Sequence, residues 1–534
     1  MRALVFLLAS ACAVGTSACA DLLGADFDDK RLGRNAAPIA EDAVLENVVE
    51  GTVGNSVQLR GSDPEGAPLI YSRASEPQRG TVEIDANGFL TYASEFSAWS
   101  PESPDGSKDQ FSYAVADALH SVTARVTVHL LPAGPTELRP EPAPPSGSMQ
   151  TDYFGAGFDF DGDRMIIGAT YDGAYILKRQ ENGTWKHEQK IKPVEEDDAR
   201  RSFGWKVALS GEWALIGAWG YNDPALSPPG RVYFYKRDGE GAYQLRQTEC
   251  ALAPPNCDAG PVDRFGIDVA LDGRFAAVGA KDDSPPALAN AGAVYVYELD
   301  AAGEHWQRVI KLTAGDEAAA NDFFGSSIAL EGNTLAVGAP GADTADNDGA
   351  PESGAVYVFE GKDWLTHRPL QLLPRRDNIA GYQMGAVALS GGRLLCGAPA
   401  AEGNGLAFLF ERDPNGVWQA PQTLAQPADV ALPNAQFGLG VAIDGDIAAV
   451  TRRVSNDNGG VFIYRREVTQ PGPQVLWKLR RTWNSTAVDS TGWAAGVRGP
   501  AVFVGATHQT PSGAAYAFNV PLQAGATFPS EAPP

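Results

Sequence analysis

The chain has 534 residues, which is too long for one ordinary domain, so two or three folded units are expected. Its 42 basic and 66 acidic residues give a formal charge of −24. Such a chain repels phosphate backbones and anionic lipid headgroups, which argues against nucleic-acid binding and against electrostatic docking to a membrane. The high content of Gly (59) and Pro (38), with many short β-like runs between turn residues, predicts an all-β chain.

The N-terminus has the pattern of an export signal. A basic end at Met1-Arg2 precedes an apolar run of about a dozen residues and then small residues. The apolar run is too short to remain as a membrane-spanning helix, and no later run approaches the roughly 20 residues that spanning requires. We therefore expect a signal peptide at 1–19 and a charged, unpatterned tether at 20–34.

Two routes of signal processing stay open. Ala18-Cys19-Ala20 fits ordinary cleavage before Asp21, whereas Ser17-Ala18-Cys19 resembles a bacterial lipobox, in which Cys19 becomes the acylated first residue. Thr16 stands where a lipobox usually has Leu. We predict lipidation of Cys19, with membrane contact only through this anchor, and hence an outer-membrane or surface-anchored lipoprotein, or a secreted protein.

The later cysteines point to local structure and not to metal binding. Cys250 and Cys257 flank a loop of six residues, and an oxidising compartment would let them form a disulfide that stiffens this loop. Cys396 lies in an apolar run and is expected to be a small buried hydrophobe. The six histidines are scattered without the spacing of zinc ligands.

Residues 35–132 predict an immunoglobulin-like β-sandwich. Six or seven short strand-like runs alternate with turn sequences such as Asp63-Pro64-Glu65-Gly66, and Val122 to Val128 alternates as a half-buried strand does. Strands of this number and spacing in about 100 residues are typical of an Ig-like sandwich.

The sequence motifs of this module resemble those of the bacterial Ig/cadherin-like domains of secreted adhesins. The resemblance rests on Asn35-x-x-Pro38, Ser62-Asp63-Pro64-Glu65-Gly66-x-Pro68-Leu69, Gly80-Thr81-Val82 and Asp109-x-Phe111-x-Tyr113-x-Val115-x-Asp117. It implies a stalk, and in that family acidic turns can hold calcium between adjacent copies. Because this chain has one copy, Asp63 and Asp117 are expected to be turn residues.

From residue 153 onward a motif recurs seven times at spacings of 49 to 62 residues. In most units an aromatic-Gly pair is followed by an apolar run that ends in Gly-Ala; the fifth unit has Met in place of the aromatic residue. The pairs that open the seven units are Phe154-Gly155, Phe203-Gly204, Phe265-Gly266, Phe324-Gly325, Met384-Gly385, Phe437-Gly438 and, with Ala in place of Gly, Trp493-Ala494. The sixth unit loses the Gly-Ala ending and reads Ala449-Val450-Thr451.

These units resemble FG-GAP repeats, the blades of integrin α-chain propellers and of many bacterial surface proteins. The resemblance implies four strands per unit and a seven-bladed β-propeller over 133–525, followed by a disordered tail at 526–534. We expect the Gly-Ala pairs to allow close packing of blades, and the Phe residues and outer-strand Trp residues to fill the space between blades. Thr136 to Pro140 has the residue pattern of an outer strand, so residues 133–142 are predicted to complete the last blade.

Calcium is the one cofactor left open. Integrin-type blades often carry a calcium loop between their first two strands, but here that connection is mostly a two-residue turn. Asp159-x-Asp161 is the nearest remnant, and its side chains are expected on alternate faces of a strand. Asp343, Asp346 and Asp348 in a longer loop are weak metal candidates, because their spacing is irregular.

No catalytic signature is present: the sequence has no Gly-x-Ser-x-Gly elbow, no phosphate loop and no zinc helix motif. We therefore predict a non-enzymatic surface binding or adhesion protein with a protein or glycan ligand, held by the loops at 219–230, 281–291 and 340–353. The alternatives are an extracellular hydrolase acting on polysaccharide or lipid, and a structural envelope component.

Overall fold

The protein was analysed as a computed structural model. It describes residues 36–49, 54–94, 108–131, 136–140, 153–180, 185–194, 202–220, 229–252, 263–342, 354–361, 370–371, 386–427, 435–453, 459–469, 474–484, 491–499, 501–507 and 513–519. The predictions for the signal peptide, Cys19, the tether, the C-terminal tail, Cys257 and Asp343, Asp346 and Asp348 fall outside these ranges. In the described ranges the structure is almost entirely β, and no helix has the length and apolar character needed to cross a bilayer.

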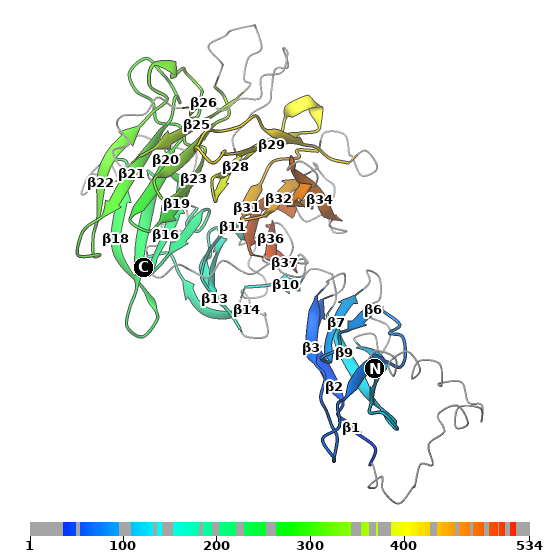
Figure 1. Cartoon of the computed structure of the whole chain (residues 1–534). Helices are drawn as coiled ribbons and strands as arrows, with labels where there is room; N and C mark the ends of the chain where they lie inside the picture. Colours follow the sequence, from blue (N-terminus) through cyan, green and yellow to red (C-terminus); the bar gives the residue numbers. More distant parts are fainter. Residues whose placement is uncertain are drawn as a thin grey trace, which may run out of the picture. The chain divides into compact units, whose positions relative to one another are not determined.

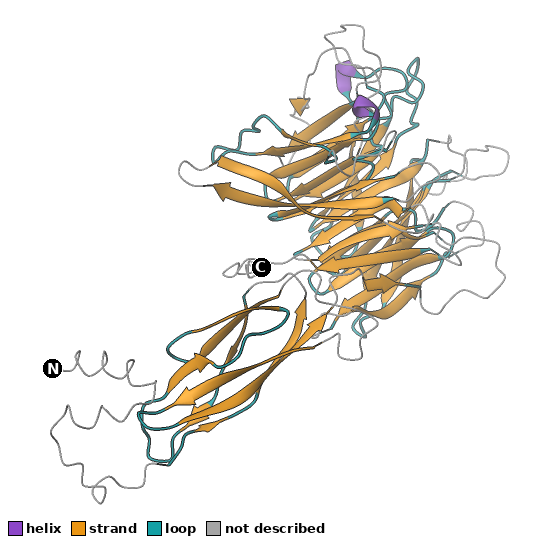
Figure 2. Cartoon of the chain, turned by 90° about the vertical axis from the view of Figure 1, so that its right-hand side faces the viewer, coloured by secondary structure: helices purple, strands orange, loops and turns teal. Residues whose placement is uncertain are grey.

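The chain divides into two compact units at Leu131–Pro132. The described part of the N-terminal unit consists of strands and loops (Figure 2). One of its sheets has the order β2-β9-β8-β5, a second has the order β3-β7-β6, and β1 and β4 form a short pair. The strands are β1 (Ile39–Ala40), β2 (Ala43–Val49), β3 (Asn55–Gln58), β4 (Gly61–Ser62), β5 (Ile70–Arg73), β6 (Gly80–Ile84), β7 (Phe89–Ser94), β8 (Lys108–Ala116) and β9 (Ser121–Leu131).

One hydrophobic core joins the two sheets of this unit. Leu90 and Tyr92 of β7 are fully buried against Tyr113 of β8 and Val126 of β9. The Tyr92 hydroxyl donates to the buried carboxylate of Asp109 at 2.7 Å, which satisfies both polar groups inside the core.

The acidic turns of the N-terminal unit stabilise their own backbone. Asp63 Oδ1 accepts hydrogen bonds from the amides of Glu65 and Ala67, and Asp117 Oδ1 accepts from those of Leu119 and His120. Both are therefore turn residues, as expected.

In the C-terminal unit the described residues form seven four-stranded sheets arranged as the blades of a β-propeller (Figure 1). Six sheets are contiguous in sequence and run from an inner to an outer strand. Their strands are β11 (Phe154–Asp161), β12 (Arg164–Ala169), β13 (Gly173–Arg179), β14 (Trp185–Ile191); β15 (Val207–Ser210), β16 (Trp213–Ala218), β17 (Arg231–Arg237), β18 (Tyr243–Cys250); β19 (Phe265–Asp272), β20 (Phe275–Ala280), β21 (Ala293–Leu299), β22 (Trp306–Leu312); β23 (Ser327–Glu331), β24 (Thr334–Ala339), β25 (Ala355–Glu360), β26 (Leu370–Gln371); β27 (Ala386–Ser390), β28 (Arg393–Ala398), β29 (Leu406–Glu411), β30 (Gln422–Leu424); and β31 (Val441–Asp444), β32 (Ile447–Arg452), β33 (Gly460–Thr469), β34 (Gln474–Asn484).

The remaining sheet joins the two ends of the unit. It contains β35 (Thr491–Arg498), β36 (Ala501–Ala506) and β37 (Ala514–Asn519), and its outer strand is β10 (Thr136–Leu138). β10 pairs antiparallel with β37, with Thr136 opposite Ala517 and Leu138 opposite Ala515. The sheet edge of β37 is thereby covered by a segment almost 380 residues earlier in the chain.

Glycine in the second strand of a blade allows neighbouring blades to approach closely. A Cβ added to Gly217 of β16 would lie 2.4 Å from the carbonyl oxygen of Gly266, which opens the next inner strand. In the sixth blade the corresponding residue is Thr451, whose hydroxyl donates to the carbonyl of Gly492 at 2.6 Å. The decayed Gly-Ala ending of that repeat thus replaces a van der Waals contact with a hydrogen bond.

The aromatic residue before Gly is fully buried where the pattern is intact, in Phe154, Phe203, Phe265, Phe324 and Phe437. Each packs edge-on or near edge-on against an aromatic ring of its own blade's third strand, as Phe265 does on Tyr295 at 5.3 Å.

The register of the seventh repeat differs from the predicted one. Thr491 pairs with Ala506 as Phe154 pairs with Ala169 in the first blade. The Phe-Gly position is therefore Thr491-Gly492, and the prediction of Trp493-Ala494 was wrong by two residues. A threonine in place of the aromatic residue hid the motif, and Trp493 in consequence has a different role, described below.

Strand boundaries vary more between blades than the pairing does. In the fourth blade Phe324 makes only an isolated bridge with Gly292, and β23 begins at Ser327. Trp477 lies inside β34 and Trp418 precedes β30, yet both pair with the equivalent residue of the third strand, Arg466 and Arg412.

Candidate functional site: the central channel and its two mouths

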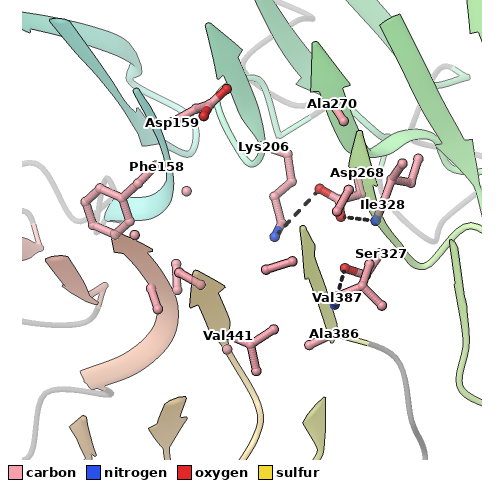
Figure 3. Close-up of a pocket in the computed structure, with 18 of the residues that line it drawn as sticks. Phe158, Asp159, Lys206, Asp268, Ala270, Ser327, Ile328, Ala386, Val387 and Val441 are labelled. Atoms are coloured by element: carbon pink, nitrogen blue, oxygen red, sulfur yellow. Dashed lines mark hydrogen bonds and ion pairs between the residues drawn. The ribbon is translucent and has the colours of Figure 1, made fainter. Parts of the chain in front are cut away.

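The inner strands β11, β15, β19, β23, β27, β31 and β35 border a central channel with a cavity of about 270 Å³. An inner strand has no further strand on this side, so alternate backbone amides of its inner edge face the channel and need other partners. Side chains of the preceding blade supply them (Figure 3). Asp268 Oδ2 accepts from the amide of Ile328 at 2.8 Å, and the Ser327 hydroxyl accepts from that of Val387 at 3.2 Å.

Asp159 of β11 provides the same kind of contact. Its Oδ2 accepts from the amide of Leu209 in the next blade at 2.7 Å, and its Oδ1 from that of Phe160 at 2.8 Å. The wall of the channel surrounds this carboxylate, and burial raises its pKa to about 7, although the two amide hydrogen bonds lower it. Asp159 is therefore shared between its charged and neutral forms near neutral pH.

At one end of the channel, the residue before each turn glycine binds the next blade. This end, the turn mouth, is formed by Asp161, Ser210, Asp272, Glu331, Ser390, Asp444 and Arg498. The first six each accept a hydrogen bond from the amide of the next blade's turn glycine, namely Gly211, Gly273, Gly332, Gly391, Gly445 and Gly499, at 2.5 to 3.1 Å.

The seventh blade departs from this pattern. Its residue at the equivalent position is Arg498, and a guanidinium group has donors but no acceptor. Its charge favours the ionised form of the neighbouring Asp159 and so opposes the rise of that carboxyl's pKa.

Asp159 and Asp161 both bind the backbone of the second blade, Asp159 through Leu209 and Asp161 through Gly211. The expectation that they point to alternate faces was wrong, because residues i and i+2 of a strand share a face. Among the residues that the structure describes, no group of three or more His, Cys, Asp or Glu side chains is arranged to hold a metal ion.

The opposite end of the channel, the aromatic mouth, opens into a cavity of about 670 Å³. Two positions of each repeat supply much of its lining. One is the second residue after the aromatic position, as in Ala156, Trp205, Ile267, Ser326, Leu439 and Trp493, and the other is the residue after Gly-Ala, as in Thr170, Trp219, Lys281 and Thr507.

Three tryptophans form an arc over this mouth. The ring centroids of Trp205 and Trp219 are 6.2 Å apart, and those of Trp205 and Trp493 are 6.1 Å apart. Trp205 and Trp493 belong to the second and seventh blades and meet next to the first blade, whose equivalent residue is the small Ala156. Tyr153 and Tyr171 pack on each other at 5.7 Å in the same lining.

Positively charged side chains lie against these rings or line the mouth. The Arg453 guanidinium lies 4.4 Å from the centroid of the Trp493 ring. Lys206 lines both the mouth and the channel, 3.7 Å from the Asp268 carboxylate, and Lys281 lines the mouth 3.4 Å from Asp282. Burial lowers the pKa of Lys281, while the charge of Asp282 opposes this shift. The described lining contains two lysines and no carboxylate.

Three polar atoms at the mouth have no hydrogen-bond partner among the described residues: Thr170 Oγ1, Ser202 Oγ and Trp493 Nε1. Thr170 is 2% exposed and Ser202 is 0% exposed. Ser202 also has a φ of 62°, a left-handed conformation that a non-glycine residue adopts only under constraint. All three atoms are buried and present almost no surface to the cavity, so the candidate binding site is defined by the rings and lysines that line it.

The predicted site residues lie elsewhere. Cys250 is buried at the end of β18, and its pairing with Cys257 stays a prediction because Cys257 lies outside the described ranges. Cys396 is fully buried and unpaired, as expected. Of the three predicted ligand loops, two contribute their first residues, Trp219 and Lys281, to the aromatic mouth.

Comparison with known families identifies the building blocks of the chain. The FG-GAP repeat family matches residues 185–235, 256–297 and 306–359, and the bacterial Ig domain family matches residues 35–129. The chain therefore contains FG-GAP repeats and a bacterial Ig domain, as the sequence motifs predicted. No curated protein matches it.

Solved structures similar to the chain include other propellers. The periplasmic gluconolactonase of Pseudomonas aeruginosa is 16% identical over 67% of this chain and 96% of its own, with a TM-score of 0.40. The β-propeller domain of the Trilobed protease from Pyrococcus furiosus is 8% identical over 69% and 96%, with a TM-score of 0.37. The computationally designed Ika8 protein is 13% identical over 89% and 99%, with a TM-score of 0.39. Similarity at this level gives no information about function.

Proposed function

We propose that this chain is an extracellular binding or adhesion protein whose closed, seven-bladed propeller holds its ligand at the aromatic mouth. The observation that carries the proposal is the arc of Trp205, Trp219 and Trp493 over a cavity of about 670 Å³. Its volume falls within the range of about 300–1,000 Å³ that is usual for ligand pockets, and rigid aromatic side chains with a few polar groups are their typical lining.

Binding is favoured over hydrolysis by how the channel carboxylates are used. Asp159 and Asp268 each accept one backbone hydrogen bond from the next blade and one from the following residue of their own strand. A catalytic pair needs oxygens that can reach a substrate and exchange protons with it. These carboxylates serve the scaffold, so the proposal assigns the mouth a binding role.

The order of segments fits presentation at a cell surface. We propose that acylation of Cys19 anchors the chain, followed by the tether, the Ig-like sandwich as a stalk, and the propeller. Substituting Cys19→Ala should move the protein from the membrane fraction to the soluble fraction of the producing cells. Retention of the variant in the membrane fraction would contradict lipid anchoring.

The binding role is tested with the double variant Trp205→Ala/Trp493→Ala. The full mature chain and the variant are applied to arrays of surface glycans and of envelope proteins. We expect a defined set of bound probes for the native chain and a loss of at least about 30-fold in affinity for the variant, since central aromatic anchors contribute about 2 kcal/mol or more. The melting temperature should change little, because both rings line a cavity.

Two outcomes would overturn the proposal. Equal binding by the double variant would place the ligand site elsewhere. Release of new reducing ends or fatty acids from a bound probe during prolonged incubation would favour the hydrolase alternative.

A further inference from the structure

The aromatic mouth differs in charge from the rest of the molecule. The chain carries a formal charge of −24, yet the described lining of this mouth holds Lys206 and Lys281 and no carboxylate. Each lysine is paired with a carboxylate outside the lining, Lys206 with Asp268 and Lys281 with Asp282. Arg264 and Arg453 lie against the rings of Trp219 and Trp493, so the four cations at the mouth outnumber these two carboxylates. In a strongly acidic protein a local excess of cations at a cavity indicates a ligand that carries negative charge.

The side chains of the lining narrow the chemical class of the ligand further. The tryptophan rings offer flat apolar faces, which suit the C–H faces of a sugar ring. Tyr153, Tyr171 and Ser326 bring hydroxyl-bearing side chains to the same lining. A hydroxyl can donate or accept, so it matches the many hydroxyls of a saccharide.

The lysines supply positive charge, which a carboxylate would bind and a neutral sugar would not. Lys281 is 20% exposed and its pKa is lowered by burial, so its ammonium group has lost part of its hydration. A carboxylate that approached it would form a charge-assisted hydrogen bond, which is stronger than a bond between neutral groups. Lys206 lines both the mouth and the channel.

From these contacts we infer that the ligand of the aromatic mouth is a short saccharide bearing a carboxylate group, such as a uronate oligomer. The sugar rings stack on the arc formed by Trp205, Trp219 and Trp493, and the carboxylate is bound by Lys206 and Lys281. This inference rests on the proposed binding function and names the class of ligand. A short oligomer fits better than a long polyanion, because carboxylates outside the mouth would meet the negative charge of the remaining surface.

The test is calorimetric titration of the full mature chain with trimers of galacturonate, mannuronate and glucuronate, each compared with its methyl ester. The ester keeps the sugar rings and removes the charge. We expect at least one trimer to bind and its ester to bind at least about tenfold more weakly, the size of a charged hydrogen bond. Lys281→Met and Lys206→Met should each weaken binding of the acid about tenfold and leave binding of the ester nearly unchanged.

Lys478→Met is the matched control. It removes the same charge from β34, on an outer strand away from the mouth, and should leave the affinity for the acid unchanged. Equal affinity for acid and ester, or equal effects of the three lysine substitutions, would overturn the inference and leave the binding function standing. Absence of heat with all three trimers would overturn the inference as well. Binding of the acid that survives Trp205→Ala/Trp493→Ala would contradict the proposed site itself.

Discussion

The two mouths of the channel are built from the same seven inner strands but differ in how their polar groups are used. At the turn mouth, Asp272 and Asp444 bind turn amides of the following blades, and four further side chains do the same around the ring. At the aromatic mouth, Thr170 and Ser202 are buried without such a partner among the described residues. The repeat thus joins its blades through these side chains at one end, and at the other end its polar residues are not used in this way.

The difference follows from the position of each side chain within the repeat. The residue before the turn glycine faces an unpaired amide of the neighbouring blade, so Asp, Glu and Ser are favoured there in six of the seven blades. The residue after Gly-Ala faces the open cavity and has no such constraint. It accordingly varies from Thr170 to Trp219, Lys281 and Thr507.

The largest effect on stability is expected when a buried side chain that joins two blades is removed. Asp268→Ala would leave the amides of Ile328 and Val269 without their acceptor and Lys206 without its carboxylate partner. Unfolding free energy should fall by about 2–3 kcal/mol, since unsatisfied buried donors cost about 1–3 kcal/mol. Chemical denaturation measures this change. Asp268→Asn keeps one acceptor and should lose less, and equal losses would argue against the hydrogen bonds as the cause.

A smaller effect concerns pH. The pKa of Asp159 is raised to about 7 in the folded chain by burial, and that of Asp263 to about 6 by burial and by the charge of Asp283. The folded state therefore binds more protons than the unfolded state between about pH 4 and 7, so the stability contributed by protonation is present at low pH and is lost as pH rises through 7. Thermal unfolding from about pH 5 to pH 8 should show a decline in melting temperature that is shallower in Asp159→Asn. Parallel profiles for the two proteins would contradict this role of Asp159.

The sequence predicted the fold largely because the repeat imposes it. The Gly-Ala endings specify where second strands end, and the five buried phenylalanines before glycine precede or open the inner strands. An outer strand within 133–142 could be expected from its residue pattern. The prediction failed where one residue departs from the pattern. Thr491 replaces the aromatic residue of the seventh repeat, so Trp493 was interpreted as a packing residue and its place at the mouth was missed.

The candidate site was harder to predict than the fold. Trp205, Trp219 and Trp493 are separated by up to 288 residues in sequence, and only the ring arrangement brings them together. The sequence does carry a signal for this site once the repeats are aligned in the register of the structure. The second position after the aromatic residue is Trp in the second and seventh repeats, and it is small or aliphatic in the first, third, fourth and sixth.

We propose that the aromatic mouth binds a ligand and that the turn mouth stabilises the ring of blades. This division of roles is tested most directly by measuring both affinity for the uronate trimers and melting temperature in two variants, Trp205→Ala/Trp493→Ala and Asp444→Ala. We predict that the first loses affinity and keeps its melting temperature, whereas the second melts lower and keeps its affinity. Loss of both properties in both variants, or loss of affinity in Asp444→Ala alone, would contradict the division of roles between the two mouths.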